Sequence, residues 1–179
     1  MKLMVHYIFS TGILTLINSY FTGFFRGFSI AVIMSFLGNT VIDHFGHKRK
    51  ITKYGLIPVR SPSTHSFENS IIIGLSISFF IILIMYIFNN LAPITITVIS
   101  GILVGPSHLF LDAFTQGGIY IKSKKHWRRF AIAHLRYNNK IINATTAFFG
   151  IFLIIISFSG FGVIFVYIRD VFNYLSLIF

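Results

Sequence analysis

The sequence predicts an all-α, polytopic integral membrane protein with five or six transmembrane helices. Of the 179 residues, 55% are apolar, and the mean hydropathy is +0.80, which exceeds what soluble domains show. In addition, several apolar stretches reach the roughly 20 residues that a helix needs to cross a bilayer. Because no change of composition divides the chain, we expect residues 1–179 to form a single membrane domain.

The expected helices follow the apolar stretches in order: 3–21, 24–42, 70–88, 91–114 and 143–168. The last stretch is either one long tilted helix or a shorter helix followed by a sixth span over 161–179. The first stretch has no small-residue cleavage site and contains His6 and Asn18, so we expect a retained helix and not a cleaved signal peptide. Short outer turns are expected near 21–26 and 89–93.

The basic residues predict the orientation of these helices. Twelve of the 15 Lys and Arg residues lie in two connections, at about 44–68 and 115–141. By the positive-inside rule, both connections and the N-terminus face the cytoplasm, as in a protein of the inner or plasma membrane. Attraction to anionic membrane lipids explains the remaining basic excess better than nucleic-acid binding does. Within the second connection, residues 122–140 combine basic residues with Trp127 and other aromatics, which predicts a basic interfacial helix.

The few acidic residues predict a metal site. The chain has four acidic residues and no cysteine, so a metal would have to be held by histidine and carboxylate. Three of the four stand beside histidines. These groups are Asp43 with His44 and His47, His65 with Glu68, and His108 with Asp112. Residues three or four apart share one face of a helix, which suits them to hold a divalent metal together.

The predicted topology brings these groups to the same membrane face, together with His6 at the start of the first span. Ionisable residues at membrane depth are costly and usually mark function. Simpler interpretations remain open for single residues. Glu68 follows a good helix start, so it is equally expected as a helix N-terminal residue, and His6 as a lone interior histidine. His47 adjoins a basic run and is expected to be solvated.

Four motifs resemble one known family. Residues 107–118 read SHLFLDAFTQGG, which is similar to the S-H-x-x-x-D-x-x-T-x-x-G signature of the YdjM-like family, whose members are inner-membrane proteins described as metal-dependent hydrolases. Residues 64–66 and 42–44 resemble that family's T-H-S and I-D-H motifs, and His6 resembles the histidine of its early G-H-x-x-F motif. The resemblance covers about residues 4–127. Two departures are Val41, where the family has a second Asp, and the lack of His-Arg before T-H-S.

A more distant similarity extends to the all-helical zinc phosphoesterases, which include bacterial zinc-dependent phospholipase C and fungal single-strand nucleases. This similarity implies a hydrolase for a phosphoester, and a site at headgroup level favours a lipid substrate. Likeness of this kind does not by itself establish a substrate.

We therefore expect a membrane-bound, metal-dependent phosphoesterase. The expected ligands of a divalent metal, Zn²⁺ above all, are Asp43, His65, His108 and Asp112, followed by His6 and His44. Zinc would activate a water molecule and polarise the phosphoryl oxygen. Glu68 or Asp43 would accept the proton of that water, and Arg60 would meet an anionic substrate. The alternative is a non-enzymatic protein, either a metal- or proton-coupled transporter or a scaffold with a structural His/Asp cluster. A transporter would carry its ligands near the middle of the bilayer.

Overall fold

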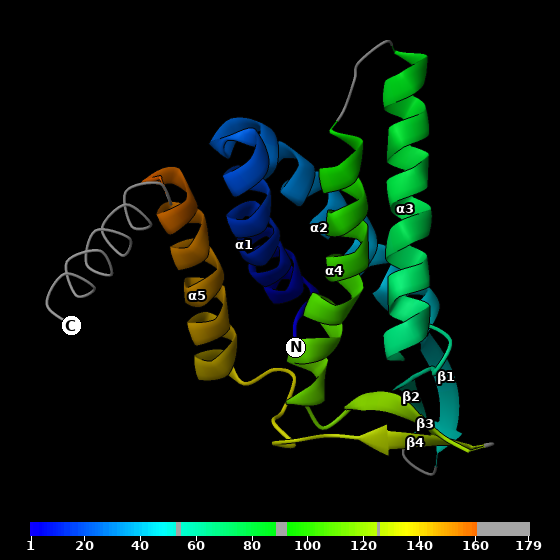
Figure 1. Ribbon diagram of the computed structural model, residues 1–179. Coiled ribbons are helices and arrows are strands. Elements are labelled where there is room, and N and C mark those ends of the chain that lie inside the picture. The colour runs from blue at the N-terminus through cyan, green and yellow to red at the C-terminus, as the bar shows by residue number, and fades with distance from the viewer. Residues whose placement is uncertain (53–54, 89–92, 125, 161–179) are drawn as a thin grey trace, which may run out of the picture.

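Helices dominate the computed structural model, which describes residues 1–52, 55–88, 93–124 and 126–160. The helices stand side by side, with the N-terminus at the same end as both β-hairpins (Figure 1). They are α1 (Leu3–Thr22), α2 (Phe24–Gly46), α3 (Phe67–Ile87), α4 (Ile94–Ala113) and α5 (Lys140–Phe158).

Four of the described helices, α2 to α5, are long and apolar enough to cross a membrane, so the chain has the character of an integral membrane protein. The first expected span forms as α1 but is not among these four. Its Ser10, Thr15 and Asn18 are fully buried, because α1 packs against α2, α4 and α5. Polar residues in that protected position lower the hydropathy of the helix without meeting lipid. The expected sixth span, 161–179, lies outside the described residues.

Small residues bring the helices close together. Helices α1 and α2 are separated by Gly23 alone, whose φ of 76° is in the region that favours glycine. Between α3 and α4, a Cβ atom at Gly101 would lie 2.6 Å from the carbonyl oxygen of Gly74, so a larger side chain would force the helices apart. Close approach of this kind is typical of helix contacts in membranes.

The basic residues between α4 and α5 do not form the expected interfacial helix. Instead, β3 (Ile119–Ser123) pairs antiparallel with β4 (His126–Phe130), and loop residues lead from there to α5. The strands are rich in Ile, Tyr, Trp and Phe, which favour extended structure. Lys124, at the turn, has a φ of 53°, which a helix could not contain.

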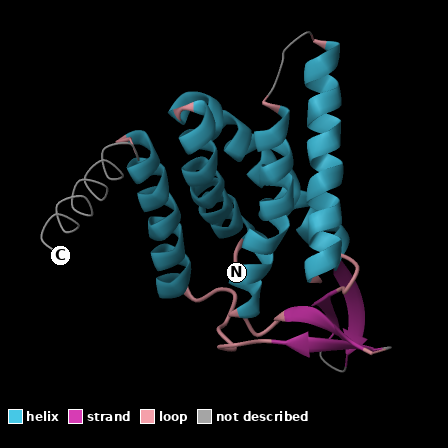
Figure 2. Ribbon diagram, viewed as in Figure 1, coloured by secondary structure: helices cyan, strands magenta, loops and turns pink. Residues whose placement is uncertain are grey.

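A second hairpin lies at the same end of the helices (Figure 2). Strand β1 (His47–Thr52) continues directly from α2 and pairs antiparallel with β2 (Gly55–Arg60). The two hairpins are joined to the start of α3. The backbone N–H of Tyr120 donates to the carbonyl oxygen of His65 at 2.8 Å, and the Tyr120 hydroxyl donates to the carbonyl oxygen of Arg60 at 3.0 Å. The hairpin β3–β4 therefore holds the segment that carries His65.

Candidate metal centre

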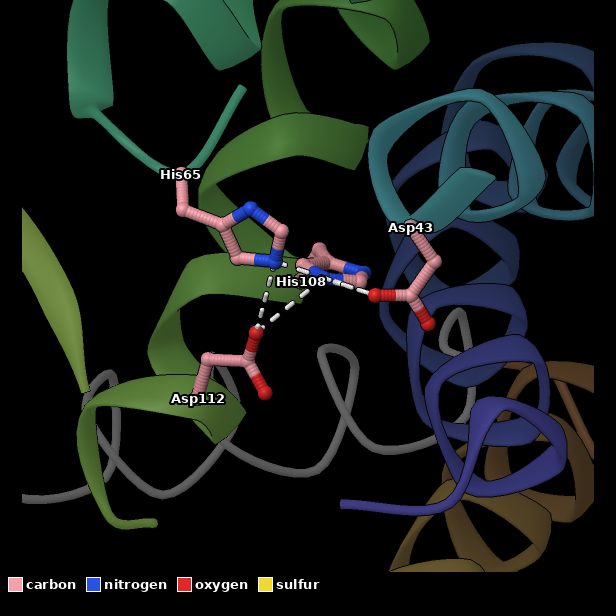
Figure 3. A group of neighbouring side chains, drawn as sticks. All are labelled: Asp43, His65, His108 and Asp112. Carbon is pink, nitrogen blue, oxygen red and sulfur yellow. Dashed lines mark ion pairs between the residues drawn. The ribbon is translucent and has the colours of Figure 1, made fainter. Parts of the chain in front are cut away.

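Three segments of the chain bring four polar side chains together at this end of the helices (Figure 3). Asp43 lies in the last turn of α2, His65 just before α3, and His108 and Asp112 one turn apart near the end of α4. One nitrogen or oxygen atom from each lies within 4.8 Å of the others, in a group that could hold a metal ion. The structure thus brings together the four residues that the sequence predicts first as ligands.

The spacing of these atoms suits a single ion. Asp112 Oδ2 lies 3.4 Å from His65 Nε2 and 3.2 Å from His108 Nε2. Asp43 Oδ1 lies 3.7 Å and 3.6 Å from the same two nitrogens. Two ligands of a tetrahedral zinc lie about 3.3–3.4 Å apart, given metal–ligand distances of about 2.0–2.1 Å. Asp112 meets this spacing closely, and Asp43 stands slightly further out.

The atoms that face one another have no other partner. His65 Nε2, His108 Nε2 and Asp112 Oδ2 are buried and accept or donate no hydrogen bond within the described part of the chain. A buried polar atom without a partner is costly. A cation between the four side chains would satisfy all three atoms at once, so the residues fit a metal ion.

Contacts behind the ligands orient both histidines. His108 Nδ1 lies 2.8 Å from Asn39 Oδ1, while the Asn39 amide nitrogen donates to the Ser35 carbonyl oxygen at 2.7 Å. Because an amide oxygen only accepts, His108 Nδ1 must donate its proton, which leaves Nε2 free as a ligand. His65 Nδ1 lies 2.8 Å from Thr64 Oγ1, a hydroxyl that can either accept or donate in this contact. Such contacts are a common feature of metal-binding histidines.

Arg60 holds the outer oxygen of Asp112. Its Nη2 donates to Asp112 Oδ1 at 2.5 Å, and its Nη1 donates to Thr115 Oγ1 at 2.8 Å and to the Gly118 carbonyl oxygen at 3.0 Å. This arrangement directs Oδ2 of Asp112 toward the group. The sequence-based prediction had given Arg60 contact with a substrate. That contact stays a prediction, and what the structure shows is the bond from Arg60 to Asp112.

The carboxylates of the group favour positive charge at His65. Burial lowers the pKa of the His65 imidazole, but the adjacent carboxylates of Asp112 and Asp43 outweigh burial and raise that pKa above its ordinary value of 6.5. The raised pKa means that the two carboxylates favour positive charge near Nε2 of His65.

The remaining predicted residues lie outside the group of four. His6 is buried and closest: its Nε2 is 3.3 Å from Asp112 Oδ1, and its ring stacks on His108 with centroids 4.1 Å apart. His44 is exposed and contacts the ring of Phe45. Glu68 is exposed on the first turn of α3 and makes no hydrogen bond or ion pair with any described residue. His47 bonds to the Asp43 carbonyl oxygen at 2.7 Å through Nδ1.

Sequence reasoning missed Asn39. A signal was present, because Asn39 is an amide inside an otherwise apolar span and stands four residues before Asp43, on the same helix face. Asn39 is fully buried, which is compatible with a role that consists only of holding His108.

A cavity of about 770 Å³ adjoins the group at Asp43. The side chain of Asp43 is 17% exposed, whereas those of His65, His108 and Asp112 are completely buried. Arg60, Tyr120 and Arg129 also line this cavity. A molecule in the cavity would therefore reach the group from the side of Asp43.

The fold and the site together define a helical membrane protein with a His/Asp group, able to hold a metal ion, at the ends of its helices. The chain belongs to the DUF1286 family, described as a protein of unknown function, whose family model matches residues 1–111. That match includes Asp43, His65 and His108 and ends one residue before Asp112. No curated protein and no solved structure matches the chain.

Proposed function

We propose that this protein is a membrane-bound, metal-dependent hydrolase that acts on a phosphoester, as the resemblance to the YdjM-like hydrolases suggests. One observation carries the proposal. Three buried ligand atoms without hydrogen-bond partners face the half-buried carboxylate of Asp43, which borders a cavity. Structural metal sites are closed, whereas catalytic sites keep one side open to substrate. Here the side of Asp43 is the open one.

Zinc is the metal that these residues favour. Imidazole nitrogens and carboxylate oxygens are ligands that Zn²⁺ accepts readily in a tetrahedral site, and ligation by His65, His108 and Asp112 would leave the fourth position open for water. When bound, zinc would lower the pKa of a water molecule and polarise a phosphoryl oxygen. His65, His108 and Asp112 would hold the ion in a fixed position. Their side chains are themselves held by Thr64, Asn39 and Arg60, respectively.

Asp43 is the proposed proton acceptor. Its carboxylate stands further from the two histidine nitrogens than that of Asp112 and borders the cavity, where a water molecule could approach both the metal and the substrate. It is therefore positioned to take a proton from the attacking water. The other sequence-based candidate, Glu68, is exposed and outside the group, which favours Asp43 for this role.

The proposed location is the inner or plasma membrane, with the site facing the cytoplasm. The N-terminus, both hairpins and the metal group share one end of the helices, and the basic connections predict that this end is cytoplasmic. A lipid phosphoester could then reach the site from the headgroup layer without leaving the bilayer.

The central test is metal content and activity of the purified protein, compared with Asp43→Asn. We expect the wild type, purified without chelators, to carry a divalent metal and to hydrolyse a phosphoester probe in detergent micelles. At saturating Zn²⁺, Asp43→Asn should retain metal through His65, His108 and Asp112, while the rate falls by about 100- to 10,000-fold.

Two results would contradict the proposal. A protein that carries no metal and takes up none on titration is not a metal hydrolase. A protein that binds metal but hydrolyses neither phosphomonoester nor phosphodiester lipids belongs instead to the transporter or scaffold class.

The orientation can be tested separately, because the chain has no cysteine of its own. A single cysteine at Lys124, in the turn of hairpin β3–β4, should resist an impermeant thiol reagent applied to intact cells. The matched control is a cysteine at Arg26, exposed in the first turn of α2 at the other end, which should react. Labelling at position 124 together with protection at position 26 would show that the orientation is the opposite of the proposed one.

A further inference from the structure

We infer that the cavity beside Asp43 contains a subsite for the phosphate group of the substrate, formed by Lys2 and Arg129. The inference rests on the proposed hydrolase function and identifies the residues that would bind its substrate. Neither residue belongs to the metal group, and they come from distant parts of the chain, just before α1 and in β4.

The charges around the cavity favour an anion. Lys2, Arg60 and Arg129 all line it, and Asp43 is the one carboxylate among the lining residues. Arg60 is already committed to Asp112 and is nine-tenths buried, so it contributes a fixed positive charge at the inner end. Lys2 and Arg129 are exposed, and no described residue pairs with either side chain. Their charges are therefore available to a ligand.

The pairing of β3 with β4 selects Arg129 over its neighbour. Arg129 stands opposite Tyr120 in the register, and Arg128 stands opposite Ile121. Residues directly opposite one another project from the same face of a hairpin, and successive residues project from opposite faces. Tyr120 and Arg129 both line the cavity, whereas Arg128 and Ile121 do not. The hairpin therefore presents one arginine to the cavity and turns the other away.

The ligand chemistry follows from the cavity as a whole. Arginine and lysine bind phosphate oxygens through charge-assisted hydrogen bonds. The volume of about 770 Å³ exceeds what a phosphate ion needs, and Leu3, Val59 and Tyr137 add apolar surface. This combination fits a phosphate that carries an organic group. Such a group can belong to a lipid headgroup or to a water-soluble phosphoester.

The experiment compares Arg129→Gln with Arg128→Gln, which removes the same charge from the other face of the strand. Inorganic phosphate binding to each full-length protein is measured by calorimetry in uncharged detergent, with metal content determined on the same samples. Loss of one charge-assisted contact predicts about tenfold weaker phosphate binding in Arg129→Gln. Arg128→Gln should stay within about twofold of the wild type. Lys2→Gln should weaken binding as Arg129→Gln does.

A second arm distinguishes the two sources of the phosphate. The same variants are compared in phosphatidylcholine nanodiscs with and without phosphatidic acid. If phosphatidic acid competes with free phosphate in the wild type and less so in Arg129→Gln, the subsite accepts a lipid headgroup. If it does not compete, while the dependence on Arg129 persists for free phosphate, the subsite accepts a soluble phosphoester.

Two outcomes would overturn the inference: no phosphate binding to the wild type, or equal loss in Arg128→Gln and Arg129→Gln, which would indicate general electrostatic attraction. The metal measurements keep this result separate from the proposed function. If the protein takes up no metal but binds phosphate in a way that depends on Arg129, the subsite stands and the hydrolase proposal is rejected. Metal-dependent hydrolysis that is insensitive to Arg129 would do the reverse.

Discussion

Helices α2 and α4 differ from α3 and α5 in what their surfaces meet. The most apolar stretches of α2 and α4 are 44% and 56% buried within the protein, against 17% for each of α3 and α5, which lie at the outer edges of the molecule (Figure 1). The outer pair is also the more apolar. High hydropathy among these helices therefore marks the outward-facing pair, whereas buried polar residues mark the contacts between helices.

The four residues of the candidate metal centre follow the same division. Asp43, His108 and Asp112 come from α2 and α4, whereas His65 comes from the segment before α3 and not from that helix itself. The outer helices contribute no side chain to the group of four. The candidate site therefore lies where the helices cover one another.

The largest expected effect comes from removing an inner ligand. His108→Ala and Asp112→Asn should each abolish metal binding and lower hydrolysis by roughly a thousandfold or more, since the metal supplies several kcal/mol of transition-state stabilisation. Element analysis and rate measurements on the same samples check this. Phe110→Ala, on the same helix but 54% exposed, is the control and should retain both properties. Equal losses in Phe110→Ala would erase the distinction between the two surfaces of α4.

A smaller effect is expected at Asn39, which supports a ligand without being one. Asn39→Ala removes the acceptor of His108 Nδ1 and should lower metal affinity by about 10- to 100-fold. Metal titration against a competing chelator measures this. The control is Ser76→Ala on α3, whose hydroxyl is exposed and bonds only to its own helix. Unchanged affinity in Asn39→Ala would show that the ring of His108 is oriented by packing alone.

The smallest effect is expected at Glu68. Because this carboxylate is exposed and lies at the N-terminus of α3, Glu68→Gln should leave the rate nearly unchanged and lower stability by about 1 kcal/mol or less. Rates and denaturation of the two proteins decide the matter. A fall of a hundredfold or more at unchanged metal content would restore Glu68 as the proton acceptor and displace Asp43.

Patterns within single segments were readable from the sequence. Apolar runs indicated the helices to within a few residues at most ends, because burial in lipid imposes both length and composition. The spacing of His108 and Asp112 already placed both on one helix face. The convergence of Asp43, His65, His108 and Asp112 followed from counting helix ends on one side of the membrane, and the structure brings the four together.

Features that depend on tertiary contact were not readable in the same way. The extended form of hairpin β3–β4 is supported by hydrogen bonds from Tyr120 to the carbonyl oxygens of His65 and Arg60, which lie far away in the sequence. The role of Arg60 likewise depends on Thr115 and Gly118 lying within reach of its guanidinium group. Glu68 shows the converse limit: its proximity to His65 in sequence does not bring its side chain into the group.

The ion pair between Arg60 and Asp112 has a consequence for how the protein matures. Arg60 compensates one of the two carboxylates from within the chain, so the folded protein does not depend on an ion to offset that buried charge. Small zinc domains, by contrast, unfold when their metal is removed. Under the proposed function, metallation would therefore be separable from folding: the helices would assemble first, and the ion would enter afterwards from the side of Asp43, where the cavity adjoins the group.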